Sequence, residues 1–99
     1  MVKANDLIKE QQDRDNKKFI IFDKILKNIE KKILRQSKVN LYYTWYEIPE
    51  FLLGSPSYSY NECVKYNVKK LKNNGFDIEL FKPNILLIKW FPKEKKNNN

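Results

Sequence analysis

The sequence predicts an α+β domain in which helices pack on a small antiparallel sheet. Three observations predict it. Apolar residues recur three and four positions apart through 17–36, as on one face of a helix. A Ser-x-x-Glu pattern at Ser59 opens a second helix. Apolar and polar residues then alternate strictly over 76–81, as in a strand. Because 99 residues suffice for one domain but not for two, we expect a single folded unit.

The first helix is predicted over residues 17–36. Its apolar stripe comprises Phe22, Leu26, Ile29 and Ile33, widened by Phe19 and Ile25. The opposite face is basic and carries Lys17, Lys24, Lys27, Lys31 and Arg35. Residues 1–16 are polar and carry charges of both signs. We expect them to form a flexible arm, either a frayed helix or a disordered segment.

An aromatic segment at 41–47 predicts the first strand. One face would carry Leu41, Tyr43 and Trp45, and the other Tyr42, Thr44 and Tyr46. The next segment, EIPEFLLG at 47–54, predicts a short helix. Pro49 suits its first position and Gly54 its C-terminal cap. A rigid polar loop, SPSY at 55–58, would follow.

The second long helix is predicted from Tyr60 to about Asn73. Its buried stripe would comprise Tyr60, Val64, Val68 and Leu71. Its exposed flank would carry Lys65, Lys69 and Lys72, with Tyr66 also pointing outward. Asn74 and Gly75 supply the left-handed stop that commonly ends a helix.

A β-hairpin is predicted at the end of the domain. Strand 76–81 would turn through 82–84 into strand 85–91. Phe76, Ile78 and Leu80 would point inward on the first strand. On the second strand one face would carry Leu86, Ile88 and Trp90, and the other Ile85, Leu87 and Lys89. The tail, KEKKNNN at 93–99, is of low complexity, and we expect it to be disordered. The folded domain would therefore span 17–92.

The predicted order is helix, strand, short helix, helix, strand, turn, strand. This is the order of a winged-helix domain, whose third helix and hairpin meet DNA. A generic packing of helices on a small sheet has the same order, so both architectures stay open.

The basic charge is concentrated in the two long helices. The chain carries +8 in all. Eight basic and two acidic residues give +6 over 17–40, and four basic and one acidic give +3 over 60–75. Lysines outnumber arginines 18 to 2, a ratio that A/T-rich codon usage also produces. The position of the charge is therefore more informative than its sum.

The residue types that catalysis needs are scarce. The chain has no histidine and one cysteine, Cys63, which falls beside a predicted buried stripe. The pairs Glu47/Glu50 and Asp77/Glu79 fit a helix N-terminus and a solvent-facing strand better than an acid–base pair. We therefore expect no enzyme, metal site or cofactor. No apolar run is long enough to cross a membrane.

Nucleic acid is one predicted partner. In a winged-helix arrangement the candidate contacts would lie near one another; they are Lys65, Tyr66, Lys69, Lys72 and Lys82. A possible second basic stripe comprises Lys24, Lys27, Lys31 and Arg35. Arginine, the better reader of bases, is absent from the first set, so binding would be nearly independent of sequence.

A protein partner, or self-association, is the alternative. Tyrosine and tryptophan are enriched at interfaces. The aromatic set comprises Tyr42, Tyr43, Trp45, Tyr46 and Tyr58. An open strand face, or the corner at 47–54, could meet another protein or a second copy. The same residues would equally well fill a small core.

From residue 29 onward the chain resembles a family of short uncharacterised proteins of nucleocytoplasmic large DNA viruses, the mimivirus-like and marseillevirus-like giants. The matching blocks are EIPEFLLG (47–54), P-x-Y (56–58), EC (62–63), LKNNGF (71–76) and PNILLI-x-W (83–90). Ser57 and Ser59 depart from the family, which more often has an apolar residue and Asp there. The resemblance implies a giant-virus origin and a shared fold. We therefore expect the protein in the host cytoplasm, the viral factory or the virion, where a protein partner would be a viral protein. It implies no activity.

Overall fold

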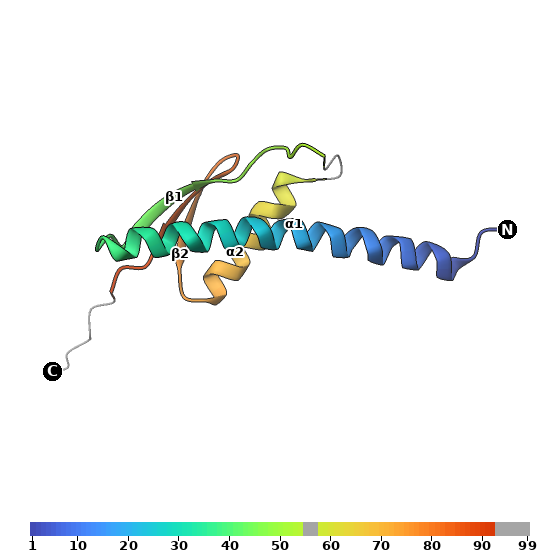
Figure 1. Cartoon of the computed structure of the whole chain (residues 1–99), viewed down its shortest axis with the longest axis horizontal. Helices are drawn as coiled ribbons and strands as arrows, with labels where there is room; N and C mark the ends of the chain where they lie inside the picture. Colours follow the sequence, from blue (N-terminus) through green and yellow to red (C-terminus); the bar gives the residue numbers. More distant parts are fainter. Residues whose placement is uncertain (55–57, 93–99) are drawn as a thin grey trace.

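The computed structural model describes residues 1–54 and 58–92. Its elements are α1 (Ala4–Lys38), β1 (Tyr43–Glu47), α2 (Tyr60–Asn73), β2 (Asp77–Phe81) and β3 (Ile85–Lys89) (Figure 1). Helices on an antiparallel sheet confirm the predicted α+β class. The predicted loop at 55–58, apart from Tyr58, and the tail at 93–99 lie outside the described residues.

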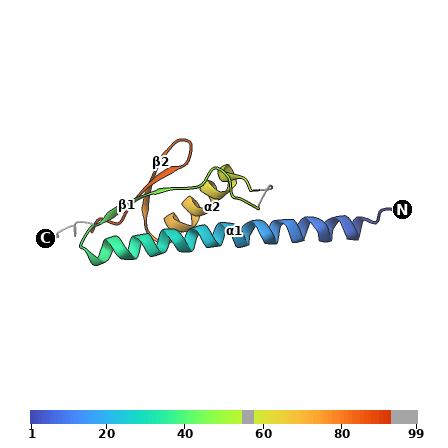
Figure 2. The same ribbon diagram turned by 45° about the horizontal axis from the view of Figure 1, so that its top comes forward.

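The three strands form one antiparallel sheet in the order β1-β3-β2. Thr44 of β1 is opposite Ile88 of β3, which in turn is opposite Ile78 of β2. Helix α1 contacts β1, and α2 contacts β2. Figures 1 and 2 show β1 running beside the C-terminal half of α1, with the hairpin of β2 and β3 next to α2. The helices therefore share one face of the sheet.

The core lies between the helices and that face. Its buried apolar side chains come from α1, α2, β3 and the residue that follows β1; they are Phe22, Ile25, Ile29, Ile33, Ile48, Cys63, Val64, Leu71, Leu86 and Ile88. The spacing of the α1 members repeats the predicted apolar stripe, although Ile25 rather than Leu26 is fully buried. Their burial accounts for most of the attraction between helix and sheet.

Helix α1 begins at Ala4, thirteen residues before the predicted start. Its 35 residues correspond to about 52 Å. Residues 4–17 are exposed throughout and project beyond the rest of the chain (Figures 1 and 2). The segment contains no glycine or proline, and extending a helix that already exists avoids the cost of nucleation. The apolar period predicts only the part of the helix that packs.

The predicted short helix at 47–54 is wrong. Residue Ile48 instead extends the pairing of β1 with the hairpin, because its N–H donates to the carbonyl of Asn84 at 2.9 Å. The carbonyl of Pro49 accepts from the Tyr58 hydroxyl at 2.7 Å. Both partners are distant in sequence, so local helix signals could not reveal them. Without this helix, the element order no longer matches the full winged-helix order.

Other local signals are confirmed. The Ser59 side chain caps α2 by accepting from the N–H of Glu62 at 3.4 Å. Gly75 has a positive φ of 94° at the predicted end of α2, in the left-handed region where glycine is favoured. Gly54 also has a positive φ, of 78°, but there is no helix there for it to cap. The hairpin turns at 82–84 as predicted. Asn84 is buried in that turn, and its amide donates to the carbonyl of Ile48.

Candidate nucleic-acid interface

The predicted basic flank of α2 is exposed. Lys65, Lys69 and Lys72 lie four and three residues apart, so they share one side of the helix. The cap at Ser59 and the stop at Gly75 fix the ends of α2 on either side of them. The opposite side packs Cys63, Val64, Asn67 and Leu71 into the core. The lysines are therefore held outward by the burial of the other face.

A groove joins this flank to the hairpin. Its volume is about 410 Å³. The residues that line it are Tyr60, Asn61, Val64, Lys65, Leu80, Lys82 and Pro83. Two predicted contacts, Lys65 of α2 and Lys82 of the turn, therefore lie at the same groove. No carboxylate is among its lining residues. An anionic ligand there would meet two ammonium groups and no side chain of its own charge.

Glu62, the acidic residue of α2, pairs with a lysine of α1. Its carboxylate lies 3.1 Å from Nζ of Lys18, which also approaches Asp15 at 3.7 Å. The hydrogen bond that Lys18 donates to Glu62 raises the pKa of Lys18. Glu62 is thus drawn toward α1. This pairing offsets the repulsion that a carboxylate at the start of α2 would exert on phosphate.

Tyr66 does not point outward, so its predicted orientation is wrong. Its ring lies 5.4 Å from that of Phe19 and 5.5 Å from that of Phe22, between the two helices. Its hydroxyl donates to Asp23 at 2.6 Å, and this hydrogen bond raises its pKa to about 12. Tyr66 therefore joins α2 to α1, on the flank of α2 away from the groove.

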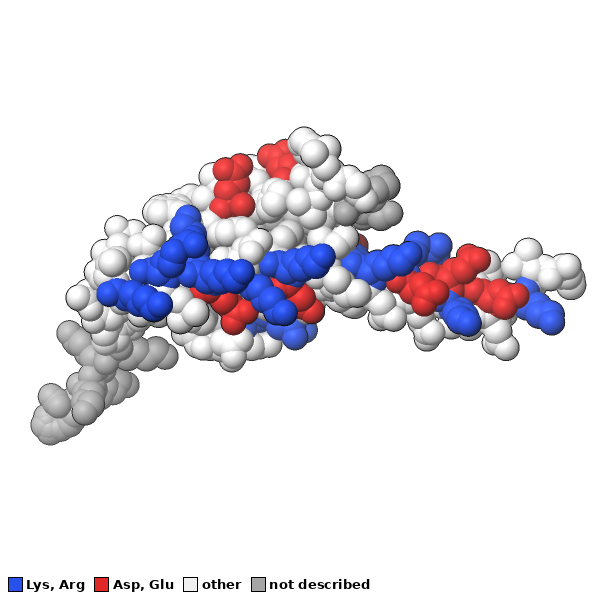
Figure 3. Space-filling model, in the orientation of Figure 1, with Lys and Arg blue, Asp and Glu red and all other residues white. Residues whose placement is uncertain are grey.

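The second basic stripe forms a separate surface. Lys24, Lys27, Lys31 and Arg35 are all exposed on the face of α1 opposite its buried residues. Figure 3 shows basic side chains in a row along this part of α1, whereas the projecting end of the helix mixes both charges. The α2 flank lies at the hairpin groove instead. The two basic stripes therefore belong to different helices, and Lys65 is the member of the α2 set that opens on the hairpin groove.

The aromatic set divides between the core and an open face. Tyr46 and Tyr58 pack against the core. Tyr43 and Trp45 point to the other face of the sheet, where the Trp45 ring lies 5.3 Å from Phe81. Tyr42 is exposed near Phe91, with ring centroids 6.2 Å apart. The part played by Phe81 was missed, although the alternation of 76–81 places it on the side opposite Phe76, Ile78 and Leu80.

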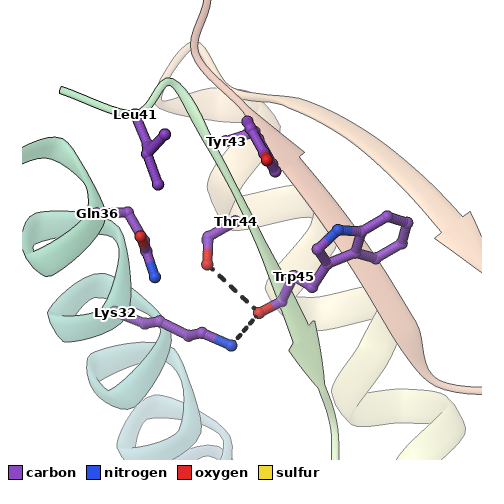
Figure 4. Close-up of a pocket in the computed structure, with 6 residues that line it drawn as sticks. All are labelled: Lys32, Gln36, Leu41, Tyr43, Thr44 and Trp45. Atoms are coloured by element: carbon purple, nitrogen blue, oxygen red, sulfur yellow. Dashed lines mark hydrogen bonds between the residues drawn. The ribbon is translucent and has the colours of Figure 1, made fainter. Parts of the chain in front are cut away.

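A small cavity of about 210 Å³ lies between α1 and the free edge of β1 (Figure 4). Lys32 of α1 reaches across it and donates to the carbonyl of Trp45. A lysine that caps an edge strand discourages pairing with another strand. Lys32 therefore protects the free edge of β1 at this cavity.

Cys63 is fully buried, as predicted. Burial raises the pKa of its thiol, so the thiolate needed of a nucleophile is disfavoured. In residues 1–54 and 58–92, no three histidine, cysteine, aspartate or glutamate side chains lie close enough to hold a metal ion. No helix in the same ranges combines the length and apolar composition that crossing a membrane requires.

Comparison with known proteins identifies a family. The chain matches a family described as a family of unknown function (DUF5759) over residues 2–72. No curated protein and no solved structure matches it. The matched range takes in α1, β1 and almost all of α2, so it includes the projecting arm and ends before the hairpin. Since the match covers well over half of the sequence, the chain belongs to this family of unknown function.

Proposed function

We propose that this protein is a non-catalytic module that binds nucleic acid through its phosphates, with little regard to sequence. The groove between α2 and the hairpin carries the proposal, because it joins Lys65 and Lys82 with no carboxylate in its lining. Lys69 and Lys72 continue the basic surface along α2. The helix and hairpin would take the places of recognition helix and wing in a winged-helix-like arrangement.

The chemistry of this surface supports electrostatic binding. Its cations are lysines, which neutralise phosphates but lack the planar guanidinium with which arginine makes paired hydrogen bonds to guanine. Neutralising about four phosphates gives a salt slope of roughly −3.6, so affinity should fall about a hundredfold between 50 and 200 mM salt. Two DNA duplexes of unrelated sequence should bind alike.

Fluorescence anisotropy with a labelled 20-base-pair duplex tests the proposal. The triple variant Lys65→Glu, Lys69→Glu, Lys72→Glu should lose binding at 50 mM salt while keeping its circular dichroism spectrum. The matched control is Lys24→Glu, Lys27→Glu, Lys31→Glu, which makes the same change in net charge on α1. No binding by the wild type at low salt would refute the function. If only the α1 variant lost DNA binding, the binding site would lie on α1 instead of α2.

The open face of the sheet favours a second candidate, a protein-interaction or virion structural component. The exposed pair Trp45 and Phe81 lies on this face, and Phe51 and Leu53 stand out from the corner at 47–54 with 75% and 94% exposure. The giant-virus origin that the sequence resemblance implies would place either function in the viral factory or the virion. In a pull-down with this protein as bait, a partner protein that binds the wild type but not Trp45→Ser would support this candidate. A partner that binds both equally would count against it.

A further inference from the structure

The outer face of the sheet is an exposed apolar surface. Its three aromatic side chains are Tyr43, Trp45 and Phe81, which remain 42%, 44% and 46% exposed. Leu87 lies between Trp45 and Glu79 in the register and is partly exposed. In the described part of the chain both helices lie on the other face, and neither covers this one. Antiparallel sheets more often present polar side chains to water, so an apolar face of this kind marks an interaction site.

The same face is acidic, although the chain as a whole carries +8. Its charged side chains are Glu47 on β1, Asp77 and Glu79 on β2, and Lys89 on β3. They sum to −2. Lys89 is engaged with Glu79 at 2.8 Å. A partner for this surface should therefore combine apolar side chains with positive charge.

The outer face of α1 has that combination. Ile20 and Leu34 are 56% and 60% exposed there, and they are separated by two heptads with Lys27 midway between them. Lys24, Lys31 and Lys38 lie alongside. From Ile20 to Lys38 the helix covers about 27 Å, so a five-residue strand, about 17 Å long, would meet only part of it. The two surfaces agree in charge and apolar content.

We propose that a second copy of this chain docks the outer face of its α1 on the open face of the sheet. The inference rests on the second candidate function and names its partner. Pairing of two sheets, or of two α1 helices, would instead bring like charges together. Because α1 and the open face lie on opposite sides of one domain, each copy offers one surface of each kind. Such head-to-tail contacts extend into chains unless a ring closes.

The association should be weak and sensitive to salt. Three strands about 4.8 Å apart and about 17 Å long offer less than the roughly 800 Å² per partner of a stable interface. Sedimentation velocity from 10 to 200 µM should show a sedimentation coefficient that rises with concentration at 50 mM salt. At 500 mM salt the 12.0 kDa monomer should remain.

Charge reversal tests the pairing of surfaces. Lys27→Glu with Lys31→Glu on α1 should weaken association at least tenfold, as should Glu47→Lys with Asp77→Lys on the sheet. An equimolar mixture of the two variants should associate again, because the intact sheet of one meets the intact helix of the other. Lys69→Glu with Lys72→Glu on α2, the same charge change as the first pair, should leave association unaltered.

Two results would overturn the proposal. One is a wild type that stays monomeric at 200 µM and 50 mM salt. The other is association that persists in both reversed variants. Capture of a different protein through Trp45, with no self-association, would retain the second candidate function while removing the second copy as its partner. Nucleic-acid binding is tested by α2 variants, so its outcome is independent.

Discussion

Tyr66 shows how a single side chain joins two helices. The sequence predicts that Tyr66 points outward from α2, but its ring packs against Phe19 and Phe22 of α1. Its hydroxyl donates to Asp23, 43 residues earlier in the chain. Lys70 lies above the ring, with Nζ 5.4 Å from its centre. The contact fixes the rotation of α2, and with this rotation Lys65 faces the hairpin groove.

The Tyr66–Asp23 bond predicts a dependence of stability on alkaline pH. The hydrogen bond raises the Tyr66 pKa from about 10 to about 12, so the folded state favours the protonated phenol. Its stabilising contribution is complete below pH 10 and is lost as the pH rises through 12. Urea unfolding should therefore show the wild type more stable than Tyr66→Phe at pH 8, with the difference vanishing near pH 12. Tyr42→Phe, at an exposed position, is the control. A difference that stayed constant with pH would contradict the prediction.

At the scale of elements, the hairpin turn holds the chain that leaves β1. Asn84 contacts Ile48 twice, once through its carbonyl, which accepts from the Ile48 N–H, and once through its side-chain amide. Both residues are buried. This pair directs 48–54 along an extended path where the local sequence favours a helix. Tertiary contacts commonly override weak local propensity of this kind.

Asn84→Ala should destabilise the domain by about 1–3 kcal/mol, because the buried carbonyl of Ile48 loses its side-chain donor. In a domain of this size that corresponds to a melting temperature lower by roughly 4–20 °C, measurable by circular dichroism. Asn61→Ala, at an exposed position of α2, should change stability by less than about 0.5 kcal/mol. Equal effects of the two substitutions would show that Asn84 does not hold this segment.

At the scale of the whole molecule, the projecting helix determines the shape. The radius of gyration is 17.6 Å, and the longest dimension is 71 Å. A compact chain of this length would have a radius of gyration of about 13 Å. The arm adds length without adding to the core, since residues 1–17 are all exposed.

Deleting residues 1–16 should therefore change shape but not stability. The free energy of unfolding, measured by urea denaturation, should change by less than about 0.5 kcal/mol. The radius of gyration from small-angle X-ray scattering, at a salt concentration that suppresses association, should fall toward 13 Å. The deletion keeps both partners of the Lys18–Glu62 ion pair, so the loss of this pair cannot account for any change in stability. A large loss of stability would mean that the arm contributes contacts to the fold.

The sequence by itself determined the features that depend on neighbours in the chain. The ends of α2, the hairpin and the helical stripe of α1 follow from a cap, a glycine and two periodicities. Only the tertiary structure decided the path of 48–54, the role of Tyr66 and the open aromatic face. Each of these depends on contacts between residues far apart in sequence, such as Ile48 with Asn84 or Trp45 with Phe81. Spacing places a charge on one side of a helix, but packing decides where that side faces.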